Sequence, residues 1–94
     1  MNAINFLNCK SYEDIENAIK NALKYKEVVA DDEAAEEYFR DCGIEGEVCH
    51  RTIESKQVTI WNEDHQGEEV YQVTIAEHYV DSGSNDYVYS YSID

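Results

Sequence analysis

The sequence predicts an α+β fold, with two N-terminal helices packed on one face of a three- to four-stranded antiparallel sheet. Apolar residues recur with the helical period in the first half of the chain, and with a period of two after Gly46. Helices followed by a run of strands are typical of the α+β class. The chain has no linker, repeat or low-complexity tract, so its 94 residues, 1–94, are expected to form one small acidic domain.

The first helix is predicted over residues 12–26. Ser11 stands three residues before Asp14, which approximates a capping box. Acids occupy the first turn and lysines lie near the end, as the helix dipole favours. One apolar stripe at helical spacing should face the core, formed by Ile15, Ala18, Ile19, Ala22 and Leu23.

The second helix is predicted to begin at a cap on Asp31 or Asp32 and to end at Asp41. Gly43 follows where a left-handed residue commonly ends a helix. The core-facing stripe should be Ala35, Tyr38, Phe39 and Cys42, which makes Cys42 a buried thiol. Acids and Arg40 occupy the outer face.

Alternation predicts strands over 48–54, 57–61, 69–80 and 87–93, with turns at 62–67 and 81–85. Residues 4–7 could add a short N-terminal strand. In the longest strand, Tyr71, Val73, Ile75 and Tyr79 share one face. Tyr87, Tyr89 and Tyr91 share a face of the last strand, and burial of that face is favoured over exposure.

The charges are strongly asymmetric. Seven basic and 21 acidic side chains give a net charge of −14, and no Lys or Arg follows Lys56. This field disfavours direct binding to nucleic acid or an anionic membrane. No apolar run approaches a membrane span, the N-terminus lacks signal-peptide features, and three unevenly spaced cysteines fit a reduced interior. A cytoplasmic location, inside a host cell, is therefore expected.

The sequence gives little indication of catalysis, a cofactor or a metal. Cys42, Cys49 and His50 lack the spacing of a zinc site, and residues 81–86 match an EF-hand loop poorly. No nucleophile elbow, Walker loop or dinucleotide motif occurs. His78 is expected to be a half-exposed strand histidine. We therefore expect neither an enzyme nor a resident cofactor.

The acids themselves are the candidate site. A solvated face is the simple alternative, but acids occur in pairs on expected surface features, and carboxylates on a helix or strand can approximate the spacing of phosphates. The guanidinium group of arginine donates hydrogen bonds to carboxylates as well as to phosphates. Trp61 is expected to be either core or an apolar interface anchor. The predicted partner-binding residues are Glu33, Glu36, Glu37, Trp61, Glu63, Asp64, Glu68, Glu69, Asp81 and Asp86.

In size and charge, the chain resembles small acidic phage-encoded inhibitors of host nucleases, namely anti-CRISPR and DNA-mimic anti-restriction proteins. The acids at 36–37, 63–64 and 68–69, with Asp81 and Asp86, carry this resemblance. It implies a stoichiometric inhibitor that binds a basic nucleic-acid-binding surface and blocks DNA or RNA. An immunity protein or antitoxin for a basic toxin, a self-associating module pairing through residues 87–93, and a divalent-cation binder remain alternatives.

Overall fold

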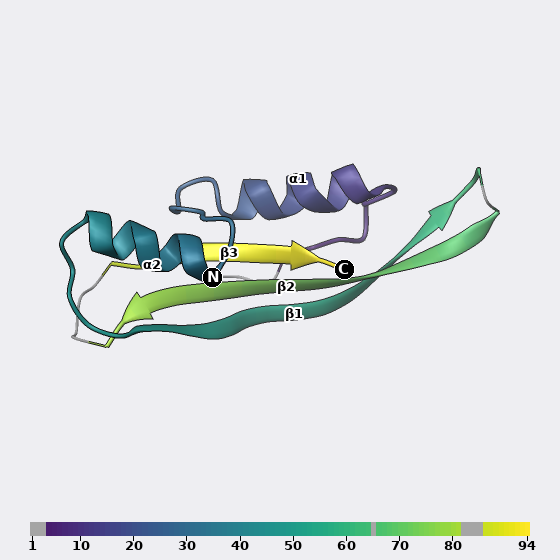
Figure 1. Ribbon diagram of the computed structural model, residues 1–94. Coiled ribbons are helices and arrows are strands. Elements are labelled where there is room, and N and C mark those ends of the chain that lie inside the picture. The colour runs from purple at the N-terminus through teal and green to yellow at the C-terminus, as the bar shows by residue number, and fades with distance from the viewer. Residues whose placement is uncertain (1–3, 65, 82–85) are drawn as a thin grey trace.

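The computed structural model describes residues 4–64, 66–81 and 86–94. Its elements are α1 (Tyr12–Ala22), α2 (Asp32–Asp41), β1 (Val48–Asn62), β2 (Gly67–Val80) and β3 (Val88–Ile93) (Figure 1). The three strands form one antiparallel sheet in the order β1-β2-β3. The predicted α+β class is therefore confirmed. Within the described residues, 4–7 add no strand, although Ile4 and Phe6 are buried in the core.

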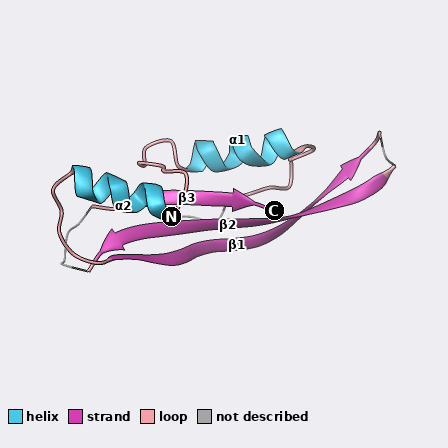
Figure 2. Cartoon of the chain, in the orientation of Figure 1, coloured by secondary structure: helices cyan, strands magenta, loops and turns pink. Residues whose placement is uncertain are grey.

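The sheet is dominated by one long hairpin. The two strands predicted over 48–54 and 57–61 are a single strand, β1, which pairs with β2 from Val48–Val80 to Asn62–Gly67. A register shift between Thr52 and Glu54 interrupts the regular pairing, as a β-bulge does. The hairpin extends beyond both helices at one end (Figure 2). The molecule is accordingly elongated, 51 × 23 × 17 Å.

Helix α1 ends at Ala22, four residues before the predicted end at 26. The Ser11 hydroxyl accepts the Asp14 amide at 3.2 Å, as the capping pattern predicted. After Leu23 the chain turns, and residues 27–29 run beside the outer edge of β3. There the Val29 amide donates to the Tyr89 carbonyl and the Tyr89 amide donates to the Glu27 carbonyl, both at 2.8 Å.

The prediction that both helices pack on one face of the sheet is wrong. Ile15 and Ile19 of α1 pack in a cluster with Val73 and Ile75 of β2. Phe39 and Ala35 of α2 pack instead with Val80 and Val88. Successive strand residues point to opposite faces, so the odd-numbered residues of β2 form an α1 face and the even-numbered residues an α2 face. Residues 27–29 carry the chain around the edge of β3 from one face to the other.

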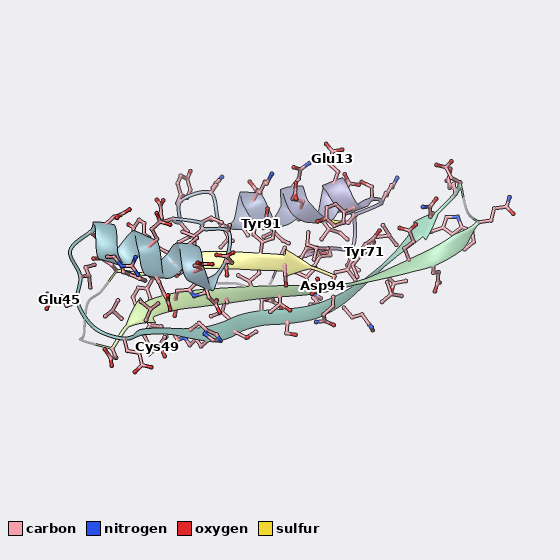
Figure 3. The ribbon with its side chains drawn as sticks, viewed as in Figure 1. Glu13, Glu45, Cys49, Tyr71, Tyr91 and Asp94 are labelled. Carbon is pink, nitrogen blue, oxygen red and sulfur yellow. The ribbon has the colours of Figure 1, made fainter. Side chains whose placement is uncertain are left out.

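The tyrosines of β3 follow the predicted alternation. Tyr89 is buried and Tyr91 is half-buried on the α1 face, whereas Tyr87, before the strand, is 44% exposed. Figure 3 labels Tyr91 and Tyr71 on the side of the sheet that faces α1. Cys42 is exposed and caps the end of α2, contrary to the predicted buried thiol, because the chain already leaves the helix there.

Gly43 has φ +73°, the left-handed geometry predicted after α2. In the described part of the chain, neither helix is long and apolar enough to cross a membrane.

Candidate partner-binding surface

The projecting end of the β1–β2 hairpin, residues 61–64 and 67–69, is called the hairpin end. Trp61 pairs with Glu68 and Asn62 pairs with Gly67, so the chain reverses within a few residues. Trp61 lies on the α2 face, beyond the reach of α2, and is 57% exposed. It is therefore not core, and the other predicted role, an apolar interface anchor, stays a prediction.

Four of the predicted acids lie at the hairpin end. Glu63, Asp64 and Glu68 are exposed, whereas Glu69 is half-buried on the α1 face. The Tyr71 hydroxyl and the Asn62 amide each donate to the Glu69 carboxylate at 2.6 Å. The hydrogen bond to Glu69 raises the pKa of Tyr71. The position of this one carboxylate is therefore fixed, while its three neighbours face solvent.

The remaining predicted acids gather toward the opposite end of the sheet, here called the α2 end: Glu33, Glu36, Glu37, Asp81 and Asp86. The carboxylate of Asp31 accepts the Ala34 amide at 2.8 Å and caps α2 as predicted. Asp81 accepts the Glu47 amide at 2.9 Å. Cys42 first, and burial next, raise the pKa of Tyr38, which lies on α2.

The predicted residues therefore do not form one continuous acidic patch. The hairpin end and the α2 end lie at opposite ends of β2, whose 14 residues span about 45 Å at the usual rise of a strand. A partner could contact both ends only with a surface nearly as long as the molecule. The spacing of the acids in the sequence could not show that the two ends are far apart, because the length of the paired hairpin sets the distance between them.

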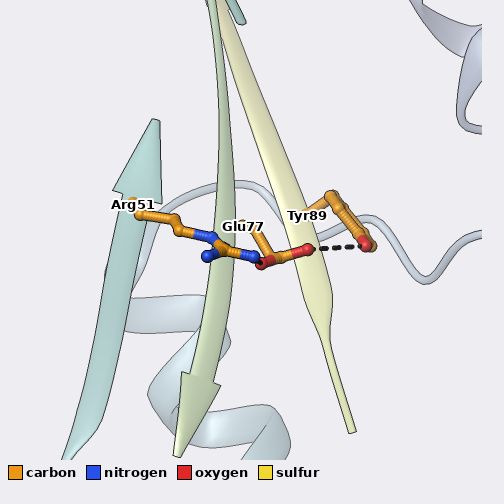
Figure 4. Close-up of polar contacts among 3 residues, drawn as sticks. All are labelled: Arg51, Glu77 and Tyr89. Carbon is orange, nitrogen blue, oxygen red and sulfur yellow. Dashed lines mark hydrogen bonds and ion pairs between the residues drawn. The ribbon is translucent and has the colours of Figure 1, made fainter. Parts of the chain in front are cut away.

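Glu77 differs from the other acids that follow Lys56. It is 9% exposed, and its carboxylate accepts hydrogen bonds from the Arg51 Nε at 2.9 Å and the Tyr89 hydroxyl at 3.0 Å (Figure 4). An ion pair of 2.7 Å joins it to Arg51 Nη2. Burial first, and the hydrogen bond to Glu77 next, raise the pKa of Tyr89. Glu77 belongs to the core, so it cannot contribute to an acidic surface.

His78 is 1% exposed, so the prediction of a half-exposed histidine is wrong. Its Nε2 lies 2.8 Å from the Ser90 hydroxyl, and its Nδ1 lies 3.6 Å from an Asp32 oxygen. Burial lowers the pKa of His78, while Asp32 opposes that shift and His50 adds to it. The Asp32 distance is too long for a hydrogen bond, and Ser90 is itself buried. We interpret this chain of contacts as the link between α2 and the sheet.

Open pockets flank the sheet in the described part of the chain, and two of them lie near predicted site residues. One, of 430 Å³, lies between the start of α2 and the α2 face. The other, of 750 Å³, lies between the start of α1 and the hairpin end. Lys10, Tyr12 and Tyr71 line the larger pocket, and sequence reasoning did not associate them with the site. The Ser11 cap gave the start of α1, but no local signal gave its position over the hairpin.

Metal binding finds no support in the described residues, where no three His, Cys, Asp or Glu side chains gather to hold an ion. Cys49 and His50 are neighbours on β1 and point to opposite faces. The EF-hand-like segment 81–86 includes residues 82–85, which lie outside the described part of the chain.

No protein-family model, curated protein or solved structure matches this chain. Its function is therefore inferred from the chemistry of the surfaces described above.

Proposed function

We propose that this protein is a stoichiometric inhibitor that binds a basic nucleic-acid-binding surface and blocks DNA or RNA from reaching it. The proposed partner is a CRISPR effector or another host nuclease, as expected for the acidic phage-encoded inhibitors that the chain resembles. The inhibitor would work inside the host cell, without catalysis or a cofactor.

The observation that carries the proposal is the hairpin end. Glu63, Asp64 and Glu68 are exposed there, beside an exposed Trp61. No Lys or Arg follows Lys56 in the sequence, so the charged side chains that β2 contributes to this end are all acidic. The hairpin projects beyond both helices (Figure 1), a shape suited to entering a groove. A large aromatic among charges is the composition of an interface anchor.

The ion pairs between lysine or arginine and carboxylates in the described residues do not involve Glu63, Asp64 or Glu68. In the described part of the chain, lysine and arginine form two ion pairs with carboxylates, Lys20–Glu16 and Arg51–Glu77. Neither pair uses an acid of the hairpin end. An uncompensated field of this kind accelerates association with a positively charged groove and makes the affinity fall as salt rises. Three exposed carboxylates could then occupy arginine and lysine side chains that otherwise hold phosphates.

The test is displacement of labelled target DNA from purified basic nucleases, measured by fluorescence anisotropy. The panel should include guide-loaded CRISPR effectors and restriction enzymes, each at about 50 mM and 300 mM salt. We expect displacement at a one-to-one ratio that weakens at the higher salt concentration. The key variant, Glu63→Gln/Asp64→Asn/Glu68→Gln, should lose at least tenfold in inhibition.

A matched control neutralises three exposed acids elsewhere, in Glu13→Gln/Glu27→Gln/Glu45→Gln. Both variants carry −14 + 3 = −11, so a difference between them reports position and not total charge. Full inhibition by the hairpin-end variant would contradict the proposal, as would the absence of any salt-sensitive partner in the panel. An inhibitor found active only against a toxin encoded beside it would favour the immunity-protein alternative.

A further inference from the structure

The 750 Å³ pocket at the hairpin end is a groove with a distinct chemistry. It is bounded by the start of α1 on one side and by β1, β2 and their turn on the other. The residues that line it include three acids and one base, Lys10. Tyr12 of α1 and Tyr71 of β2 line it as well, and Trp61 of β1 borders it from a position on the α2 face of the sheet.

The aromatic wall is fixed in place by contacts within the chain. Tyr12 and Tyr71 pack edge to face, with ring centroids 5.8 Å apart and planes at 67°. The hydroxyl of Tyr71 is held by Glu69 at 2.6 Å. Tyr12 remains 46% exposed, so part of its ring is open to an incoming group. Cations are attracted to the faces of such rings, and arginine also stacks on them.

The acidic wall lies beside the aromatic one. The Glu69 carboxylate is oriented by Asn62 and Tyr71, each at 2.6 Å. The Asp64 amide donates to the Asn62 side-chain oxygen at 2.9 Å, which fixes the turn that carries Glu63 and Asp64. A guanidinium is planar, always charged and weakly hydrated, and its fork of donors suits carboxylates. An ammonium matches the charge but not the stacking or the fork.

We propose that this groove binds the guanidinium of an arginine side chain. The proposal rests on the proposed function, because the arginine would belong to the basic partner. It assigns the first specific contact at the hairpin end: Tyr12 and Tyr71 pack against the guanidinium plane, and the carboxylates of Glu63, Asp64 and Glu69 accept its N–H groups. Charge complementarity selects this occupant, since the groove has more acids than bases and is partly aromatic.

The groove can be tested without the partner. The probes are the peptides acetyl-Gly-Arg-Gly-amide, its lysine counterpart and its citrulline counterpart, which keeps the shape of arginine but lacks the charge. Binding is followed by the fluorescence of Trp61, the single tryptophan of the chain, and by amide chemical shifts in NMR. We expect saturable binding of the arginine peptide at millimolar concentration, with at least fivefold weaker binding of the other two peptides.

Variants separate the groove from general attraction to an acidic protein. Tyr12→Ala leaves the net charge unchanged and should weaken arginine binding at least threefold. Tyr25→Ala, at a residue 89% exposed and outside the groove lining, should not alter it. The NMR spectrum of each variant also reports whether the fold is kept. Should Tyr12→Ala not fold, localisation of the wild-type shift changes to residues 10–12, 59–64 and 69–71 decides the question.

Equal responses to the arginine and lysine peptides would overturn the proposal. Shift changes spread evenly over the acidic surface, or unchanged binding in a folded Tyr12→Ala variant, would do the same. These results are independent of the displacement assay. Inhibition without arginine binding would reject the groove alone, whereas arginine binding without inhibition of any nuclease would reject the proposed function.

Discussion

Glu69 and Glu77 lie on the same face of β2, yet their surroundings differ. Glu77 is buried against Arg51 and Tyr89, and Glu69 is half-exposed at the groove. The alternation of side chains along the strand predicted that Glu69 and Glu77 share a face. It did not predict that Glu77 is buried and Glu69 half-exposed. The Arg51–Glu77 contact depends on the register beyond the irregularity between Thr52 and Glu54, and no local pattern specifies where such a shift falls.

The first prediction at this scale concerns Arg51. Replacing it with methionine should destabilise the protein by about 1–3 kcal/mol, because the Glu77 carboxylate would remain buried without its charged donor. Lys20→Met removes the same charge from a pair whose carboxylate, Glu16, is 31% exposed against 11% for Glu77, and should change stability by less than about 0.5 kcal/mol. Urea unfolding measures both. Equal effects would show that the Arg51 pair contributes no more than a surface pair.

His78 gives a prediction about pH. Its pKa is lowered in the folded protein, whereas in the unfolded chain it should be near the ordinary value of about 6.5. The unfolded chain therefore binds more protons as pH falls through that value, so the free energy of unfolding should decrease from pH 7.5 to 5.5. A reference variant without the imidazole isolates this contribution.

His78→Gln is that reference. It keeps the acids but has no imidazole to protonate, so its stability should fall less between pH 7.5 and 5.5 than that of the wild type. The comparison uses the pH slope from urea unfolding, which remains measurable even if the substitution lowers stability at every pH. Identical slopes would show that protonation of His78 is not resisted by the fold.

At the scale of elements, the helices and strands were largely predictable and their assembly was not. The Ser11 and Asp31 caps and Gly43 placed the helices to within a few residues, because caps are local. The placement of α1 and α2 on opposite faces depends on residues 27–29 pairing beside Tyr89. The partner of that segment is about sixty residues away in the chain. Long-range pairing of this kind leaves no periodic signal.

The edges of the sheet bear on self-association. The alternative of a dimer through residues 87–93 would use the outer edge of β3, but Val28 forms a parallel bridge with Tyr89 there. The other edge belongs to β1, which carries Arg51, Glu54 and Lys56 near its register shift. Charged side chains and bulges are features that disfavour edge-to-edge pairing. The edge of β3 is therefore occupied at Tyr89, and association through β1 is disfavoured.

The opposite faces yield a prediction about energetic coupling. Ile19→Val affects the α1 face and should cost about 0.5–1.5 kcal/mol, and Phe39→Leu affects the α2 face at a similar cost. Because the two side chains pack in separate clusters, the double variant should equal the sum of the singles within about 0.5 kcal/mol. Urea unfolding of the three variants provides the cycle. A larger coupling energy would indicate that both helices share one core.

Over the whole molecule, charge and shape act together. The net charge was readable from composition, but its division between two distant ends was not, because the length of the hairpin sets their separation. The exposure of Trp61 has the same cause. The hairpin extends beyond α2, so α2 does not cover the α2 face at the hairpin end. The candidate site is thus predictable in its residue types and, before the fold is known, not in its arrangement.

Self-repulsion gives the final prediction. A chain of charge −14 should gain stability as sodium chloride rises from about 20 to 300 mM, because the Debye length shortens to below about 10 Å and screens the acids from one another. Glu36→Lys/Glu37→Lys, with a charge of −14 + 4 = −10, should show a smaller gain. Urea unfolding at each salt concentration measures it, and equal gains would assign the effect to general salting-out.

The same screening should weaken the complex with a basic partner, so salt is expected to shift folding and binding in opposite directions. This opposition separates an electrostatic inhibitor from one that binds through an apolar surface, for which added salt would leave the affinity unchanged or raise it. Isothermal titration of the partner identified in the displacement assay, at the same salt concentrations, would measure the second slope. An affinity that rose together with stability would contradict an interface formed by the acids.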